Sequence, residues 1–432
     1  MSLFDEVLNI TVRVVEASPI AHALTSVTVI RDLRGRVRLV LDFKEGAPRN
    51  WKSVRSALAQ QLSLGLGPYW GGQIWHTGGR TDPVYQAMED AIRSGRQSWY
   101  DAPTHLGGAL QWYRLERIFS KSSWIGRTVR PPWTLDDPAN PPIISFYSFK
   151  GGVGRTTAVA AVALLLARAR RRVVVLDLDL EAPGVGTLLL GSITPPEDGI
   201  VDYLLEMELL GQRPANLGLY AAVQNQAQLI GDGEPIRVFT AGRLSNAFLE
   251  KIARLDFESF VGGSLNPLAE LLDHIRQEYR PEYTLLDVRA GLHDLGGLSL
   301  NGMSHLDVLF GLDTPQSWKG LEIVLPILGM AEERREAFLV HAMVTPERFD
   351  PDANTRFREH SLGLFQQYYY RADEDIPDTA DPDAPYGLPI PYQDELLNVG
   401  NLAQVMDLLM RPDGPYAHLV RLIGAYVQRE TL

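Results

Sequence analysis

The segment from Phe149 to Thr157 (FKGGVGRTT) combines glycines with cationic and hydroxyl side chains. Glycine occupies three of the four positions 151–154, and its freedom at positive φ lets successive backbone N–H groups turn towards one anion. A helix predicted to begin near Arg155 adds the positive end of its dipole. The hydroxyl of Thr156 stands where a nucleotide-bound Mg²⁺ would be coordinated. These features predict a phosphate-binding loop, because a glycine turn without a ligand would leave the flanking polar residues unexplained.

Carboxylates follow two predicted strands. Asp177 and Asp179 come at the end of an apolar run, and Asp287 ends another. Residues at i and i+2 share one face of a strand, so Asp177 and Asp179 would converge on one spot that suits a metal ion and a water. Phosphoryl transfer needs charge neutralisation and an aligned water, which such carboxylates supply. Two alternatives stay open: the acidic pair could end a strand in solvent, and Asp287 could cap a following turn.

Five apolar runs must position these groups, at 143–149, 173–178, 283–286, 308–312 and 338–344. Helical patterns separate them, the first at 156–170. Near-continuous apolar strands alternating with helices indicate a mostly parallel sheet covered on both faces, and ligands gather at the carboxyl ends of such strands. The predicted fold class is α/β, a P-loop NTPase with helices flanking the sheet. A terminal helix at 416–429 is expected to pack on this sheet and not on a membrane.

Residues 1–130 predict a small α+β domain ahead of this sheet. Patterns of period two at 8–16, 25–31 and 36–43 predict strands, and helical patterns cover 51–64, 83–93 and 110–119. No site is recognisable there, and the sequence does not distinguish protein, small ligand or nucleic acid as its target; we expect an accessory domain, with a protein as its partner. The aromatic group Tyr69, Trp70 and Trp75 is expected to close a small core. Residues 131–142 are rich in proline and predict a linker, followed by a second domain at 143–432 that contains the glycine loop.

The amino-acid composition excludes several classes of protein and of functional site. The 432 residues contain no cysteine, which removes disulfides, thiol nucleophiles and cysteine-bound metals. No apolar run is long enough for a membrane span and the N-terminus has no basic region, so a cytoplasmic protein is expected. Residues 1–142 carry 17 basic and 13 acidic residues, the rest 24 and 40. An acidic body repels phosphate backbones, which disfavours nucleic-acid binding and DNA partitioning by the second domain.

The loop departs from the G-x-x-x-x-G-K-[ST] pattern at Phe149 and Arg155. With Lys150, it resembles the deviant Walker-A ATPases of the ParA/MinD type and their K-G-G-x-G-K-[ST] loop. The resemblance covers about residues 142–432 and extends through LDLDLEAPG (176–184) and LLDVRAGL (285–292). KGGVGRTT together with GIVDYL (199–204) resembles a bacterial subgroup in which arginine replaces the loop lysine.

This resemblance implies a cofactor, ATP with Mg²⁺, and a role for each matching residue. Lys150 is the signature lysine that reaches the partner protomer's nucleotide. Asp179 orients the attacking water, and Asp287 holds Mg²⁺ with Thr156 and with Asp177 beside it. The nucleotide cradle comprises Lys150, Gly151, Gly152, Val153, Gly154, Arg155, Thr156 and Thr157, with Pro391 on the base side. The absence of an N/T-K-x-D element favours adenine over guanine.

Arg155 leaves two functions open, because a planar guanidinium does not replace a lysine point charge. It could contact the β- and γ-phosphates in bidentate fashion and slow hydrolysis, or it could mark a scaffold that binds nucleotide without turnover. Since Lys150, Thr156, Asp179 and Asp287 supply the other parts, we predict a slow ATPase that acts as a homodimeric switch. The subgroup resemblance points to bacterial conflict or antiviral defence. A P-loop tyrosine kinase is disfavoured, because the C-terminus has no tyrosine cluster.

Overall fold

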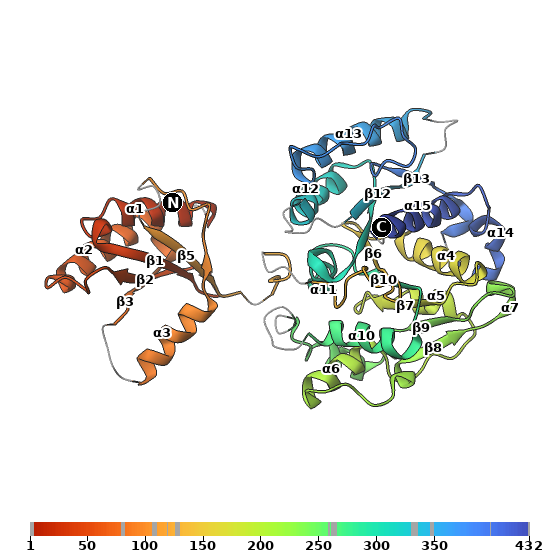
Figure 1. Ribbon diagram of the computed structural model, residues 1–432, viewed down its shortest axis with the longest axis horizontal. Coiled ribbons are helices and arrows are strands. Elements are labelled where there is room, and N and C mark those ends of the chain that lie inside the picture. Colours follow the sequence, from red (N-terminus) through yellow and green to blue (C-terminus); the bar gives the residue numbers. More distant parts are fainter. Residues whose placement is uncertain are drawn as a thin grey trace. The chain divides into compact units, whose positions relative to one another are not determined.

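The protein divides into two units, Met1–Phe119 and Ser120–Leu432. A computed structural model describes residues 4–78, 83–105, 110–118, 120–125, 130–257, 260, 266–329, 336–345, 350–397 and 399–430. Figure 1 labels their helices and strands, and each unit is described by itself.

The predicted linker belongs to the larger unit. Trp133 and Leu135 are buried in its core, and the indole Nε1 of Trp133 donates a hydrogen bond to the carbonyl of Pro141 at 2.8 Å. The boundary lies between Phe119 and Ser120, so the interpretation of 131–142 as a linker is wrong. Burial of these two apolar side chains outweighs the extended bias of the surrounding prolines.

The larger unit contains an eight-stranded sheet in the order β13-β12-β11-β6-β10-β7-β9-β8. All neighbours pair in parallel except β8 with β9. This confirms the mostly parallel sheet and all five predicted strands. The bounds are β6 Ile143–Ser148, β7 Val173–Leu178, β8 Ala221–Gln224, β9 Ile236–Phe239, β10 Tyr283–Val288, β11 Leu306–Gly311, β12 Glu336–Val344 and β13 Leu388–Pro391.

Helices cover both faces of this sheet (Figure 1). Side chains alternate along β6, with Ile143 and Tyr147 in one core and Ile144 and Phe146 in the other. The second core is covered by α4 (Arg155–Arg168), α5 (Val185–Leu190), α7 (Ala227–Ile230), α14 (Met406–Leu409) and α15 (Pro415–Glu430). The first is covered by α6 (Ile200–Leu210), α8 (Asn246–Ile252), α10 (Pro267–Tyr279), α11 (Asp294–Leu298), α12 (Pro315–Gly329) and α13 (Ala353–Tyr368).

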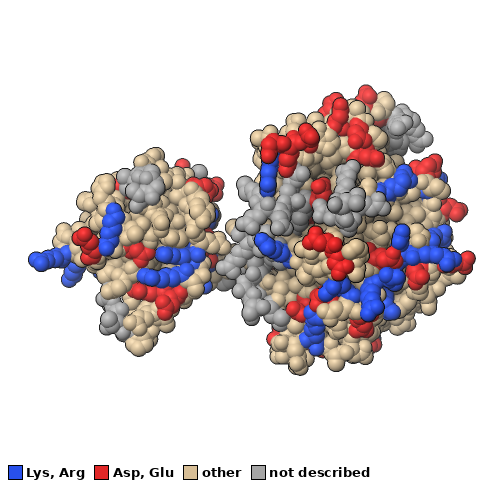
Figure 2. All heavy atoms as spheres, in the orientation of Figure 1, with Lys and Arg blue, Asp and Glu red and all other residues tan. Residues whose placement is uncertain are grey.

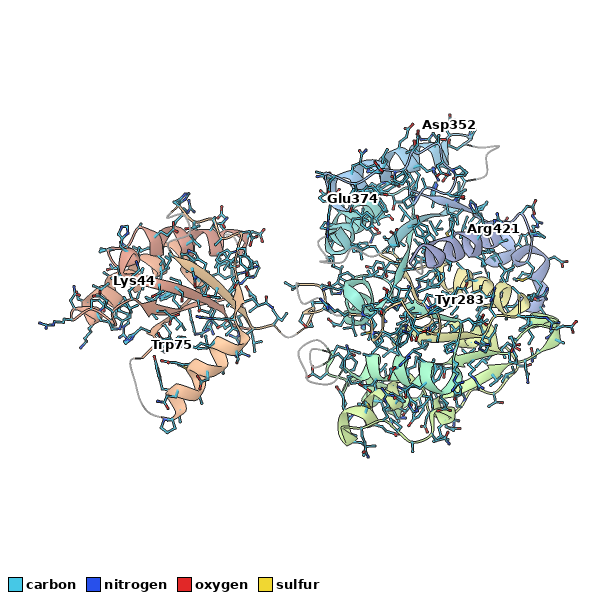
Figure 3. All side chains as sticks on the ribbon, in the orientation of Figure 1. Lys44, Trp75, Tyr283, Asp352, Glu374 and Arg421 are labelled. Atoms are coloured by element: carbon cyan, nitrogen blue, oxygen red, sulfur yellow. The ribbon has the colours of Figure 1, made fainter. Side chains whose placement is uncertain are left out.

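The terminal helix α15 packs on the sheet as predicted. Leu419, Ile423 and Tyr426 are buried in the core that α4 shares. Arg421 lies on the opposite side of the helix, where its guanidinium donates to the carbonyl of Pro412 (Figure 3). The apolar face is therefore used within the unit. Across the described part of the chain, no helix combines the length and the apolar character that a membrane crossing requires.

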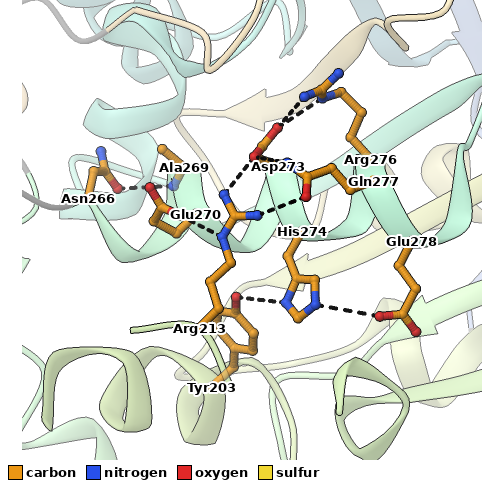
Figure 4. A network of polar contacts seen from close by, with 10 residues as sticks. All are labelled: Tyr203, Arg213, Asn266, Ala269, Glu270, Asp273, His274, Arg276, Gln277 and Glu278. Atoms are coloured by element: carbon orange, nitrogen blue, oxygen red, sulfur yellow. Dashed lines mark hydrogen bonds and ion pairs between the residues drawn. The ribbon is translucent and has the colours of Figure 1, made fainter. Parts of the chain in front are cut away.

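A polar network ties α6 to α10 (Figure 4). Arg213, just after α6, donates to Oε2 of Glu270 at 2.7 Å and to Oδ2 of Asp273 at 2.6 Å. The hydroxyl of Tyr203 lies 3.2 Å from Nδ1 of His274, and burial lowers the pKa of this histidine. These contacts fix the helices that cover β7 and β10.

The segment 120–125 is bound to α11. Lys121 pairs with Asp294 at 2.9 Å, the hydroxyl of Ser123 donates to the carbonyl of Asp294, and Nε1 of Trp124 donates to the carbonyl of His293 at 2.8 Å. The approach is close at Gly297, where a Cβ would lie 2.5 Å from the Ser123 hydroxyl and 2.7 Å from the Trp124 ring. This connecting segment therefore holds the turn that follows β10.

The smaller unit contains a five-stranded sheet in the order β3-β2-β1-β5-β4. The strands are β1 Leu24–Arg31, β2 Val37–Phe43, β3 Trp70–His76, β4 Gln97–Ser98 and β5 Gln111–Glu116, and the helices are α1 Val7–Glu16, α2 Trp51–Leu66 and α3 Pro83–Gly95. Helices α1 and α2 cover the larger core, and α3 packs on the other face. Tyr69 and Trp70 pack on the larger core as predicted, and Trp75 (Figure 3) packs against the smaller core on the other face of the sheet.

Two predictions for this unit are wrong. Residues 8–16 form helix α1, not a strand, because Val7, Thr11, Val12 and Val15 make one buried helical face. Residues 110–119 include strand β5, not a helix. This strand pairs in parallel with β1 and buries Trp112 and Leu115, so its position inside the sheet overrides the local pattern.

Candidate functional site

The glycine loop between β6 and α4 is held by backbone conformation and opens onto free space. Gly152 and Gly154 have φ of 74° and 78°, in the left-handed region that favours glycine. A Cβ built on Gly151, Gly152 or Gly154 would meet no atom within 4 Å. The first amides of a helix have no intrahelical acceptor, and at the start of α4 the N-cap residue Gly154 supplies no side-chain acceptor either. The loop thus leaves room for an anion beside its backbone, and phosphate binding there stays a prediction.

Phe149, which replaces the first glycine of the pattern, anchors this loop to α12. A Cβ on Gly320 would lie 2.1 Å from Cγ of Phe149, so the ring fills the space above that glycine. The adjacent Val153 is buried, whereas Lys150 is exposed. The described residues provide Lys150 with no ion-pair partner.

Two of the three predicted aspartates, Asp179 and Asp287, contact Arg155, and Asp177 lies beside Asp287. Asp177 and Asp287 are paired neighbours at the carboxyl ends of β7 and β10. The Nε of Arg155 donates to Oδ1 of Asp287 at 2.6 Å, and its Nη2 donates to Oδ2 of Asp179 at 3.2 Å. The third nitrogen, Nη1, lies 3.5 Å from Oγ of Ser148. All three guanidinium nitrogens thus face protein acceptors, and the Arg155 side chain is only 8% exposed.

Burial controls the ionisation of these carboxyls. It raises the pKa of Asp287, against the lowering effects of Arg155 and of the Thr156 hydroxyl. Burial, followed by the charge of Asp287, raises the pKa of Asp177 to about 8, although Oδ2 of Asp177 accepts from the amides of Gly184 and Gly186. Oδ1 of Asp177 and Oδ2 of Asp287 are buried and receive no hydrogen bond from the described residues. Such oxygens suit a cation or an ordered water.

Arg289 and Glu181 extend the site beyond the predicted residues. Arg289 lies two positions after Asp287, with Nη1 3.5 Å from Oδ1 of Asp179 and Nη2 2.9 Å from Oε2 of Glu181. Glu181 also contacts Nε2 of His293 at 3.0 Å, and burial lowers the pKa of this histidine. The sequence analysis did not propose either residue for the site. The signal that could have found Arg289 is its position directly after strand β10.

Pro391 is brought to the loop by β13. It lines a small hollow of about 50 Å³ together with Gly154, Thr157, Met343 and Tyr416. The structure therefore places the loop, Pro391 and the acidic cluster along one edge of the sheet. It places Lys150 on the exposed side of the loop.

The residues present fit a magnesium nucleotide. Thr156 contacts Asp287, which retains one unsatisfied oxygen, and the open glycine cradle lies next in sequence. Among the described residues, no group of three or more acidic or histidine side chains forms a metal cage. Nucleotide-bound Mg²⁺ does not need one, because phosphates and waters provide most of its ligands.

Comparisons with solved structures give low identities. ParA of pNOB8 bound to nonspecific DNA is 19% identical, with 67% of this chain and 100% of that chain covered and a TM-score of 0.45. MinD in the MinC:MinD complex of Aquifex aeolicus is 16% identical, with 66% and 96% covered and a TM-score of 0.43. The ParA family ATPase from Chlorobium tepidum is 16% identical, with 65% and 97% covered and a TM-score of 0.40. A search of curated protein sequences finds no match.

The family itself is shown by the sequence. Residues 144–362, just over half of the chain, match the CobQ/CobB/MinD/ParA nucleotide binding domain. The matched region begins in β6 and includes the glycine loop, Asp177, Asp179 and Asp287. The chain therefore belongs to the CobQ/CobB/MinD/ParA nucleotide-binding family.

Proposed function

We propose that this protein binds ATP with Mg²⁺, hydrolyses it slowly, and acts as a homodimeric switch that couples its nucleotide state to a protein partner through the smaller unit. The observation that carries this proposal is the open glycine loop beside the buried cluster of Arg155, Asp179 and Asp287.

Each group has a role that follows from its position. The amides of 151–157 bind the polyphosphate, and Thr156 and Asp287 hold Mg²⁺. When bound, the ion neutralises charge on the phosphates. Asp179, only 13% exposed, accepts a hydrogen bond from the attacking water and so orients it.

Slow turnover follows from Arg155. To reach a phosphate, its guanidinium must leave Asp287 and Asp179. Breaking a buried ion pair costs several kcal/mol, and each ~1.4 kcal/mol that remains uncompensated slows the reaction about tenfold. The same contacts favour the second candidate function, a scaffold that binds nucleotide without hydrolysis.

Phosphate release from ATP with Mg²⁺ separates the two candidates. Asp179→Ala should abolish release while nucleotide binding persists, because the carboxylate of Asp179 contacts the side chains of Arg155 and Arg289 and its proposed role is to orient the water, not to hold the polyphosphate. Release by the parent protein that does not exceed the Asp179→Ala background, together with intact binding, would establish the scaffold.

The dimeric role rests on Lys150. This lysine is exposed on the loop, whereas the other cationic side chain of the motif, Arg155, is buried. Lys150→Ala should therefore abolish ATP-dependent dimerisation, measured by light scattering, without lowering the thermal stability of the protomer. Lys319→Ala is the matched control, because Lys319 is also exposed and, among the described residues, its ion-pair partner is its helical neighbour Glu322. Dimerisation of Lys150→Ala at the parent level would refute the role.

The smaller unit offers a surface for a protein partner. A cavity of about 650 Å³ lies between α2, β3 and α3, lined by Trp51, Arg55, Trp75, Tyr85 and Met88 among others. Aromatic and arginine side chains are the residues that dominate protein interfaces.

Charge disfavours nucleic acid as a partner of the larger unit. Acidic side chains gather around α13 (Figure 2), with Asp352 and Glu374 near its two ends (Figure 3). A cytoplasmic location and a role in bacterial antiviral defence remain part of this proposal. The identity of the neighbouring genes would test the defence role.

A further inference from the structure

Asp179 lies between two arginines that belong to different elements. Its Oδ2 faces Nη2 of Arg155 at 3.2 Å, and its Oδ1 faces Nη1 of Arg289 at 3.5 Å. The Asp179 side chain is 13% exposed, so little water reaches it when one of these charges moves away. The charge of this carboxylate is therefore balanced mainly by the two arginines and not by water.

The two arginines are anchored very differently. Arg155 belongs to the glycine loop, at the position where the family pattern has the phosphate-contacting lysine, and its guanidinium now spans Asp287, Asp179 and Ser148. A guanidinium that turns to a phosphate cannot keep these contacts, because all three of its nitrogens are engaged.

Arg289 is fixed independently of the loop. Its Nη2 pairs with Glu181 at 2.9 Å, and Glu181 is held in turn by His293. The carbonyl of His293 accepts the hydrogen bond from Trp124 in the connecting segment. None of these contacts of Arg289 and its partners involves Arg155.

We propose that Arg289 is a positioning residue that compensates the charge of Asp179 when Arg155 leaves it for a bound polyphosphate. The inference rests on the proposed nucleotide binding, but not on hydrolysis. Without Arg289, binding would leave a largely buried carboxylate unpaired and close to phosphate anions. The cost of that unpaired charge opposes binding, so it lowers the affinity for nucleotide.

The test is a double-mutant cycle on affinity for Mg²⁺·AMP-PNP, which binds without turnover, measured by isothermal titration calorimetry. Arg289→Ala should weaken binding about tenfold, equivalent to ~1.4 kcal/mol. Arg289→Lys, which keeps the charge, should recover part of the affinity. In an Asp179→Asn background, where no charge needs compensation, Arg289→Ala should have no effect.

Arg171→Ala is the matched control. Arg171 pairs with Glu282 at 2.8 Å, just before the first residues of β7 and β10, whereas the site lies beyond the last residues of these strands. The Arg171 side chain is 55% exposed. Its removal should leave the affinity unchanged. Thermal unfolding of each variant reports on folding, and Arg289→Gln supplies the same cycle if Arg289→Ala does not fold.

The outcomes distinguish this inference from the proposed function. A parent protein that does not bind Mg²⁺·AMP-PNP refutes nucleotide binding itself. A parent that binds, together with Arg289→Ala of equal affinity, overturns only the role of Arg289. A loss of the same size in the Asp179→Asn background also overturns it, because Arg289 would then act without Asp179.

Discussion

Replacing Arg155 with methionine tests the internal ion pair most directly. Arg155→Met keeps the apolar stem but removes the guanidinium, which leaves Asp287, whose side chain is 0% exposed, without its donor at 2.6 Å. Removing one partner of a buried pair costs about 3–5 kcal/mol. With an unfolding entropy of about 2.1 cal/mol/K per residue, each kcal/mol shifts the melting temperature of a unit of this size by about 1.5 °C, so we expect a fall of about 5–8 °C.

Differential scanning calorimetry of the nucleotide-free chain measures this fall. The transition of the larger unit should move and that of the smaller unit should not. Arg171→Met is the control, because an exposed ion pair contributes about 0–1 kcal/mol. Asp287→Asn should restore part of the loss in Arg155→Met by removing the unpaired charge. A melting temperature within 1 °C of the parent would refute the reasoning.

Three further predictions concern other parts of the chain. Gly154→Ala should lower the free energy of unfolding by about 1–2 kcal/mol because of its positive φ, whereas Gly151→Ala should not; equal losses in thermal denaturation would contradict this. Burial opposes the ionisation of Asp42, but hydrogen bonds from its neighbours lower its pKa. Asp42→Asn should therefore cost about 1–3 kcal/mol at pH 7, with the difference shrinking as the pH falls from about 4 through the lowered pKa; a loss in urea unfolding that is independent of pH would contradict it. Trp124→Phe removes the hydrogen bond to the carbonyl of His293 and should cost about 1 kcal/mol and speed hydrogen exchange at 291–298, so unchanged protection there would argue against the contact.

The sheet of the larger unit could be predicted because its strands are buried on both faces. Val173–Leu178 and Tyr283–Val288 are almost wholly apolar, and such runs separated by helices leave few other arrangements. The convergence of Asp177, Asp179 and Asp287 followed from the rule that the carboxyl ends of parallel strands share one edge. Pattern and topology thus located the acidic cluster at the end of the sheet.

The secondary structure of the smaller unit and the side-chain contacts of Arg155 could not be predicted from the sequence in this way. In α1 the β-branched residues Val12, Val14 and Val15 favour a strand locally, and only burial against the sheet selects the helix. The loop pattern assigns Arg155 to phosphate, whereas its contacts depend on distances to Ser148, Asp179 and Asp287 that the sequence does not contain.

The connecting segment decides where this chain can be shortened or recombined. Lys121, Ser123 and Trp124 cover Gly297 and hold the turn after β10, although they precede the first strand of the larger sheet by some twenty residues. An ATPase fragment that begins at Ile143 would lose that cover, while one that begins at Ser120 keeps it. Any exchange of the smaller unit for another domain should accordingly be joined before residue 120.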